Sequence, residues 1–290
     1  MEGRLVGQDR SDRPVRRRVT RALALGAATV VLSGCSAELT DQFRRLGLPE
    51  PATEETPLVG DLWIGAWIAA FAVGFLVWGL ILWASIAYRR RNEDLPPQTR
   101  YNLPIEFLYT AAPFAVIAGL FYFTVQNQND ILDTSAEPDL TIGVVGHQWA
   151  WTFNYLDEDV YDEGTSDLGG IEERPTLYLP VNQTVRFELQ SPDVIHSFWV
   201  PSFYMKMDVI PGQTNTFQVT PNEEGTFAGK CAELCGVYHS RMLFNLEVVS
   251  EDEYRDHIED LRDQGQTGVI EAPLRGAFST TPLGQSGSEQ

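Results

Sequence analysis

The sequence is poor in the residues that most metal and haem centres use. Its 290 residues include three cysteines and four histidines. There is no Cys-x-x-Cys-His motif, so no c-type haem is attached to this polypeptide. Three cysteines are also too few for a disulfide-stapled scaffold. Cys35 stands alone near the N-terminus, whereas Cys231 and Cys235 lie four residues apart. The single cysteine and the pair therefore need separate explanations.

Basic residues are scarce in the C-terminal part of the chain. Between residues 128 and 290, 28 Asp and Glu stand against 8 Lys and Arg, so this part carries essentially the whole net charge of −19. A negative field of that size repels nucleic acid, which excludes a nucleic-acid partner, and it attracts a basic protein. The alternative is a solvated acidic surface that only aids solubility.

Residues 1–34 are typical of a bacterial lipoprotein signal peptide. A group of arginines precedes the apolar run 22–32, which is too short to span a bilayer. The motif Leu-Ser-Gly-Cys that ends at Cys35 resembles a lipobox, in which Cys35 becomes the lipidated N-terminus and anchors the chain in membrane lipid. The alternative is an ordinary signal peptide in which Cys35 falls by chance. Residues 35–57 are then an N-terminal extracytoplasmic segment.

Residues 58–127 predict a transmembrane helical hairpin. Two runs without a charged residue, about 62–88 and 107–125, have lengths of 27 and 19 residues, enough to cross a bilayer. The loop between them carries four arginines, so it is expected on the cytoplasmic side. Both ends of the hairpin, and everything after it, are then extracytoplasmic. The predicted location is the bacterial cell membrane, with a multi-pass anchor.

Residues 128–262 predict an all-β extracytoplasmic domain. Short segments rich in β-branched and aromatic residues alternate with Pro, Gly, Asn and Asp, which favours a Greek-key sandwich or barrel. These segments are 141–155, 176–189, 214–220, 225–230 and 243–249. An acidic loop is expected at 157–173, a short polar helix at 251–262, and a flexible tail at 263–290.

The motif with the most chemical information runs from Cys231 to Met242. It spaces Cys231, Cys235, His239 and Met242 as Cys-x3-Cys-x3-His-x2-Met, and His196 precedes it in Ser-Pro-Asp-Val-Ile-His. Two thiolates, two imidazoles and a thioether are soft ligands, which suit copper. A single-copper centre needs one thiolate, so the second cysteine predicts two copper ions bridged by both sulfurs. The Glu233 carbonyl is the natural further ligand.

Each of these residues also has an ordinary structural interpretation. Cys231 and Cys235 would form a disulfide, His239 would be a hydrogen-bonded surface histidine, and Met242 would belong to the core. Taken one at a time, these alternatives are as good as metal ligation. All of them would have to hold together by accident, so the combined spacing favours copper.

These segments resemble the binuclear copper motif of cytochrome c oxidase subunit II, of the bacterial aa3 type. The resemblance covers about residues 58 to 250 and implies a cupredoxin-like Greek-key barrel behind the two-helix transmembrane hairpin. It implies that the copper pair is held by His196, Cys231, Glu233 through its carbonyl, Cys235, His239 and Met242. The Glu233 side chain would reach a magnesium ion shared with subunit I.

The resemblance also implies a route for electrons. Residues 146–151 resemble the aromatic stretch of the family, in which the first tryptophan receives electrons from cytochrome c, so Trp149 takes that role. Trp151 is expected to pack in the barrel instead. Ala150 departs from the family, which usually has an aromatic residue there, so the donor contact surface is expected to differ.

Three further residues have a weaker basis. Glu106, just before the second span, corresponds to a glutamate at the mouth of a proton-uptake path into subunit I. The alternative is a carboxylate favoured at a helix N-terminus by the macrodipole. His147 is expected to be a hydrogen-bond partner in a strand, and His257 to be solvated.

The predicted function is that of the electron-accepting subunit of a proton-pumping cytochrome c oxidase. Four histidines are too few for an oxygen-reducing haem–copper centre, so haem must lie in a partner subunit I, beside further oxidase subunits. The donor is cytochrome c or a cytochrome c-bearing reductase subunit. Three rivals are a copper carrier, a quinol oxidase subunit and nitrous oxide reductase. A copper carrier tends to lack counterparts of His239 and Met242. A quinol oxidase subunit lacks the copper ligands, and nitrous oxide reductase needs an additional histidine-rich cluster.

Overall fold

The computed structural model describes residues 37–91, 95, 98–163 and 174–271, in two units divided after Gly47. The first unit contributes one short helix, α2 (Ala37–Arg44). The second holds all the other elements. The predicted signal peptide and Cys35 lie outside the described residues, so the lipid anchor stays a prediction.

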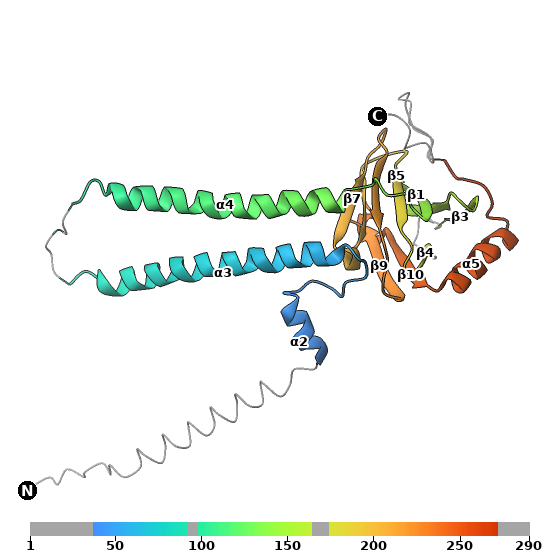
Figure 1. Ribbon diagram of the computed structural model, residues 1–290. Helices are drawn as coiled ribbons and strands as arrows, with labels where there is room; N and C mark the ends of the chain where they lie inside the picture. Colours follow the sequence, from blue (N-terminus) through green and yellow to red (C-terminus); the bar gives the residue numbers. More distant parts are fainter. Residues whose placement is uncertain (1–36, 92–94, 96–97, 164–173, 272–290) are drawn as a thin grey trace, which may run out of the picture. The chain divides into compact units, whose positions relative to one another are not determined.

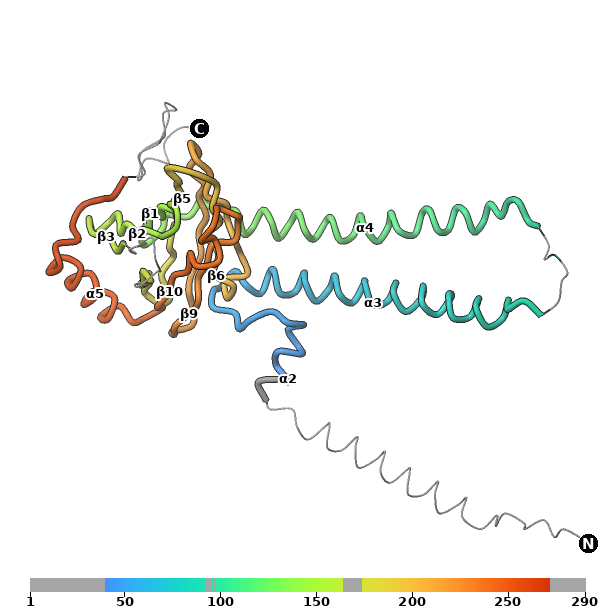
Figure 2. Tube along the Cα trace, turned by 180° about the vertical axis from the view of Figure 1, so that it is seen from behind, coloured from blue at the N-terminus to red at the C-terminus, as the bar shows by residue number. Residues whose placement is uncertain are grey.

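Two long apolar helices form the hairpin. They are α3 (Thr56–Ala87) and α4 (Leu103–Ile131), which lie side by side in both views (Figures 1 and 2). Both are long and apolar enough to cross a membrane. Each extends beyond its charge-free run, because Pro57 and Pro104 suit the first helical turn, where a backbone N–H has no partner to lose. Near the outer ends, Asn127 Nδ2 donates to the Leu58 carbonyl at 2.6 Å.

The rest of the second unit is a cupredoxin-like sandwich of two mixed sheets, as predicted (Figure 1). One sheet has the order β3-β2-β1-β5-β8 and the other β4-β10-β9-β6-β7. In chain order, the strands are β1 (Leu140–His147), β2 (Ala150–Tyr155), β3 (Val160–Glu163), β4 (Thr176–Pro180), β5 (Val185–Gln190), β6 (His196–Val200), β7 (Met205–Val209), β8 (Asn215–Val219), β9 (Gly225–Cys231) and β10 (Leu243–Val249).

Three strands differ from the sequence-based expectations. Strand β3 lies inside 157–173, which was predicted to be a loop, because its four residues pair with β2 in spite of their acidic side chains. Strands β6 and β7 were not among the predicted segments. They are five residues each and are joined by the turn η2 (Pro201–Phe203). Strand β7 pairs with β6, and β6 also pairs with β9 further along the chain, so their place in the sheet is not revealed by a local pattern alone.

The core is filled with aromatic rings from both sheets. In β10, alternate residues face inward, so that Phe244, Leu246 and Val248 are buried. The Phe244 ring stacks on Phe198 of β6 at a centroid distance of 4.9 Å. This stack needs Gly229 on β9, because a Cβ there would lie 2.0 Å from the Phe244 ring. Because Gly229 has no side chain, the backbone of β9, the strand that ends at Cys231, packs closely against this ring of the core.

The C-terminal helix α5 (Glu251–Asp263) confirms the predicted short polar helix. Ser250 and Glu253 form a capping box at its start, and Tyr254, Ile258 and Leu261 face the sandwich. Figure 2 shows α5 beside β3. The residues after α5 are also bonded, since the backbone of Ile270 exchanges hydrogen bonds of 2.8 and 3.1 Å with the Asn154 side chain. The predicted flexible tail therefore begins with an anchored segment.

His257 was predicted to be solvated, which is wrong. Its ring stacks on Tyr178 at a centroid distance of 3.8 Å, and its Nε2 is buried without a hydrogen-bond partner among the described residues. Burial lowers the pKa of His257 to about 4. The charged residues around it in sequence point outward, and the helix turns this one position toward the sheet.

We expect Gly229→Ala to destabilise the protein by about 2–4 kcal/mol, because the new methyl group overlaps the Phe244 ring. Thermal and denaturant unfolding in detergent measure the effect. Phe244→Leu in the same chain provides the control, since a smaller side chain makes room for the methyl group. If the double variant loses more unfolding free energy than the two single variants lose together, overlap at this position is not the cause.

We expect His257 to make stability depend on pH. Its pKa is about 4 in the folded protein and about 6.5 when unfolded, so the unfolded chain takes up the proton first as pH falls. The free energy of unfolding should therefore decrease between about pH 6.5 and 4. In His257→Gln this decrease should be smaller. Equal pH slopes in both proteins would contradict a neutral buried imidazole.

Candidate metal centre

The centre forms where β6 meets β9. His196 is the first residue of β6 and Cys231 is the last residue of β9, and the strands pair antiparallel with Phe198 opposite Cys231. The pairing continues into the loop, where Ala232 N donates to the Ser197 carbonyl at 3.0 Å. This short ladder brings together two ligand types that lie 35 residues apart in the sequence.

The remaining ligands come from one closed loop, residues 231–242. The loop is closed by a backbone hydrogen bond of 3.0 Å from Cys231 N to the Met242 carbonyl. The short helix η3 (His239–Arg241) turns His239 back toward the cysteines. Gly236 has φ +126°, a conformation that other residues rarely adopt. The glycine at this position therefore allows the chain to wrap around the sulfur atoms.

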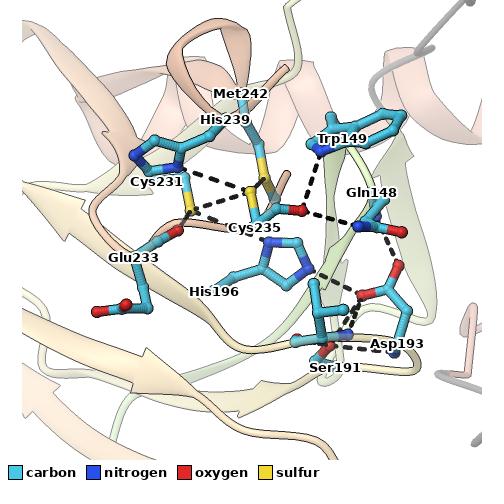
Figure 3. A network of polar contacts seen from close by, with 11 residues as sticks. Gln148, Trp149, Ser191, Asp193, His196, Cys231, Glu233, Cys235, His239 and Met242 are labelled. Carbon is cyan, nitrogen blue, oxygen red and sulfur yellow. Dashed lines mark hydrogen bonds and ion pairs between the residues drawn. The ribbon is translucent and has the colours of Figure 1, made fainter. Parts of the chain in front are cut away.

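The predicted ligand atoms converge (Figure 3). The two sulfurs of Cys231 and Cys235 are 3.8 Å apart, and both thiols are free. His196 Nδ1 lies 4.0 Å from the Cys231 sulfur, and His239 Nδ1 lies 3.6 Å from the Cys235 sulfur. The Met242 sulfur is 3.8 Å from that of Cys235. Finally, the Glu233 carbonyl lies 3.2 Å from the Cys231 sulfur.

This donor set fits two copper ions. The sulfur separation is far longer than the S–S bond of a disulfide, so both sulfurs are available as bridges. Each cysteine has its own imidazole nitrogen nearby, and each has one weaker donor, a carbonyl or a thioether. His196, Cys231 and Cys235 are buried and their ligand atoms lie within 4.8 Å of one another. Soft, buried donors of this kind select copper over hard cations.

Asp193 orients the buried histidine. Its Oδ1 lies 2.9 Å from His196 Nε2, which directs the other ring nitrogen, Nδ1, toward the sulfurs. Burial opposes ionisation of Asp193, but hydrogen bonds from His196, Gln148 N and Val194 N lower its pKa to about 2. Burial likewise opposes protonation of His196, and Asp193 and Cys231 outweigh it, so the pKa of His196 is raised.

The two thiols differ in acidity. Burial disfavours the Cys231 thiolate, but hydrogen bonds involving His196 and the Glu233 and Ser197 backbone lower its pKa to about 6. Burial, followed by the charge on Cys231, raises the pKa of Cys235. Cys231 therefore loses its proton more readily than Cys235. Binding of a cation releases the thiol protons that remain, since metals bind the deprotonated sulfur.

Trp149 lies against this loop and is partly exposed. Its Nε1 donates to the Cys235 carbonyl at 3.1 Å, and Gln148 Nε2 donates to the same oxygen at 2.7 Å. The backbone N–H of Gln148 also donates to Asp193 at 2.7 Å. The predicted tryptophan is therefore linked to the ligand loop by a hydrogen bond, and Gln148 connects both sides of the centre.

The other residues singled out in the sequence contribute no atom to this set of predicted ligands. Trp151 is fully buried in the core, as expected, and Ala150 is buried at the start of β2. His147 has its Nε2 3.4 Å from Thr152 Oγ1, which agrees with a hydrogen-bond partner in a strand. Glu106 is in the first turn of α4, where its carboxylate accepts from Asn102 N at 2.9 Å. It therefore caps the helix, and its role in proton uptake stays a prediction.

Sequence reasoning missed Asp193 and Gln148. Asp193 stands three residues before His196 in the motif that was quoted for the histidine, and a carboxylate beside a metal-binding histidine is a frequent arrangement. That spacing was the available clue. No local pattern indicates Gln148, because its partners lie 45 and 87 residues away in the sequence.

Comparison with known proteins agrees with this geometry. Residues 140–249 match the family described as cytochrome C oxidase subunit II, periplasmic domain. A probable cytochrome c oxidase subunit 2 of Streptomyces avermitilis is 49% identical, over 92% of this chain and 94% of that protein. The chain belongs to the cytochrome c oxidase subunit 2 family.

Further proteins named as this subunit are also similar to the chain. Cytochrome c oxidase subunit 2 of Mycobacterium bovis is 36% identical, over 92% of this chain and 87% of that protein. The crystal structure of the periplasmic domain of subunit II of cytochrome oxidase from Bradyrhizobium japonicum is 31% identical, covers 44% of this chain and 97% of that chain, and has a TM-score of 0.40. With its two candidate spans, this member of the family is a membrane protein.

We expect Gly236→Ala to displace Trp149. A Cβ at this position would lie 3.0 Å from two atoms of the indole and 3.3 Å from Gln148 Nε2. The variant should lose about 1–3 kcal/mol of unfolding free energy through strain and overlap, and its tryptophan fluorescence should shift.

Gly212→Ala is the matched control, because Gly212 also has a positive φ, of +81°, but a Cβ there meets nothing within 4 Å. It reports backbone strain alone. Equal losses in the two variants, with unchanged fluorescence, would show that the indole does not depend on the space at Gly236.

Proposed function

We propose that this chain is the electron-accepting subunit of a proton-pumping cytochrome c oxidase, taking electrons from cytochrome c and delivering them to haem in subunit I. The convergence of two thiols, two imidazoles, a thioether and a carbonyl carries the proposal. Copper bound as a pair would supply a one-electron carrier whose charge is spread over two metals, which keeps reorganisation small.

The residues of the chain prepare the site for that role. His196 and His239 would each hold one copper ion, and Cys231 and Cys235 would bridge both. Met242 and the Glu233 carbonyl would be the weak ligands. The hydrogen bond from Asp193 fixes the His196 ring, and the bond that closes the loop fixes Cys231 relative to Met242. A donor set held in place before binding does not rearrange much when charge changes.

Trp149 would be the point at which electrons arrive. It is partly exposed, and its indole N–H contacts the carbonyl of a ligand residue. The negative charge of the domain would attract and orient a basic cytochrome c, with rates that fall as salt rises. The donor is a separate cytochrome c or a cytochrome c-bearing reductase subunit, because this chain has no haem-attachment motif.

Partner subunits would complete the oxidase. Four histidines in the chain leave oxygen reduction, haem and proton pumping to subunit I. The exposed carboxylate of Glu233 would share a magnesium ion with that subunit, since magnesium prefers oxygen ligands. Glu106 would stand at a proton path on the cytoplasmic side, while the β-domain would lie on the extracytoplasmic face. A lipid on Cys35 would add to the hairpin anchor.

Electron paramagnetic resonance of the purified full-length chain, loaded with copper, tests the proposal. We expect a spectrum from one unpaired electron shared equally by two copper ions, at two coppers per chain. Cys235→Ser should abolish the shared signal, because a single thiolate does not bridge in the same way. His257→Gln is the control, since that histidine lies on α5, outside the set of predicted ligands, and its replacement should leave the spectrum unchanged. A single-copper spectrum, or a disulfide between Cys231 and Cys235, would contradict the proposal.

A further inference from the structure

Tyr238 is an aromatic residue of the ligand loop that the proposed ligand set does not use. It stands directly before His239 and is only partly exposed. Its ring meets the indole of Trp149 edge-on, at a centroid distance of 5.0 Å and an interplanar angle of 85°. Edge-to-face contacts of this kind are attractive because the positive edge of one ring faces the negative face of the other.

Consecutive parts of the loop together hold the indole. The carbonyl of Cys235 accepts the hydrogen bond from Trp149 Nε1 at 3.1 Å. Gly236, without a side chain, leaves room for the indole, which a Cβ would meet at 3.0 Å. Tyr238 then supplies a ring along the side of the indole. A hydrogen bond alone allows the ring to tilt about its N–H, and a second contact from Tyr238 removes that freedom.

Tyr238 is itself restrained by the turn that carries His239. Arg241 N donates to the Tyr238 carbonyl at 2.9 Å, which fixes the backbone in η3. The guanidinium of Arg241 also lies 5.9 Å from the centroid of the Tyr238 ring, a cation–π distance. The support for Trp149 is therefore tied to the same turn that carries His239.

We propose that Tyr238 is a positioning residue for electron acceptance, which it serves by holding the Trp149 indole at one angle to the ligand loop. This inference rests on the proposed function of Trp149. A fixed indole offers an approaching donor a single preformed contact surface, so less side-chain freedom is lost on docking. It also keeps the ring at a constant distance from the ligand loop during transfer.

The test uses the assembled oxidase carrying Tyr238→Ala, Tyr238→Phe or Trp149→Ala. Oxygen consumption is measured over a range of reduced cytochrome c concentrations, and again with hexaammineruthenium(II), a small reductant that does not need a protein docking surface. Tyr161→Ala, on β3, is the matched control for loss of a tyrosine ring. The copper resonance spectrum of each variant is recorded as well.

We expect Tyr238→Ala to lower kcat/KM for cytochrome c by roughly three- to tenfold, the size of one lost aromatic contact at a docking surface. Its copper spectrum and its rate with the small reductant should match those of the unmodified enzyme. Tyr238→Phe should restore kcat/KM, because the ring and not the hydroxyl makes the contact. Tyr161→Ala should be unchanged.

The other outcomes overturn one proposal or the other. Normal kcat/KM in Tyr238→Ala, with a slow Trp149→Ala, would refute the role of Tyr238 and leave that of Trp149 standing. A changed copper spectrum or a slow small reductant in Tyr238→Ala would show that the residue merely supports the ligand loop. A normal rate in Trp149→Ala would refute electron acceptance at Trp149 itself.

Discussion

The short antiparallel pairing of β6 with β9 is the constraint on which the rest depends. Without it the second sheet would separate into β6-β7 and β4-β10-β9, and His196 would lose its place beside Cys231. Only two residue pairs are in register between these strands, so the contact needs help from the core below. The stack of Phe198 on Phe244 supplies that help, because it joins β6 to β10, the two strands that flank β9 in the sheet.

The packing of the core therefore also affects the geometry of the candidate metal centre. Trp151 contacts both Phe198 and Phe244, and its indole N–H lies 3.4 Å from the Met242 carbonyl. A Cβ on Gly146 would meet Trp151 at 3.0 Å and the Cβ of His196 at 3.3 Å. Tightly packed interiors transmit small displacements, so a change in these aromatic residues is felt at the ligands.

The local features of the sequence predicted much of the fold and of the centre. Charge-free runs revealed α3 and α4, a run of β-branched and aromatic residues revealed β10, and the Cys-x3-Cys-x3-His-x2-Met spacing gathered four candidate ligands that share one loop. His196 was added as a second imidazole for a soft donor set, and the resemblance to a family motif agreed with it. These features succeed because helix, strand and loop closure are set by near neighbours in the chain.

The remainder depends on contacts between distant segments. Strand β3 was hidden by its acidic residues, and β3, β6 and β7 are each stabilised by a partner strand that the local sequence does not show. His257 looked solvated, since the pattern does not show that Tyr178 lies beneath α5. Asp193 belonged to the quoted motif, but its role became clear only when the structure placed its carboxylate beside the His196 ring.

The two hydrogen bonds to the Cys235 carbonyl have a chemical consequence for the choice of ligands. A carbonyl oxygen has two lone pairs, and the donors of Gln148 and Trp149 occupy both. This oxygen is therefore saturated and is kept out of the donor set, although it belongs to a ligand residue. The oxygen of Glu233 faces the Cys231 sulfur instead, so the neighbouring side chains would select this backbone oxygen, and not that of Cys235, for the proposed copper pair.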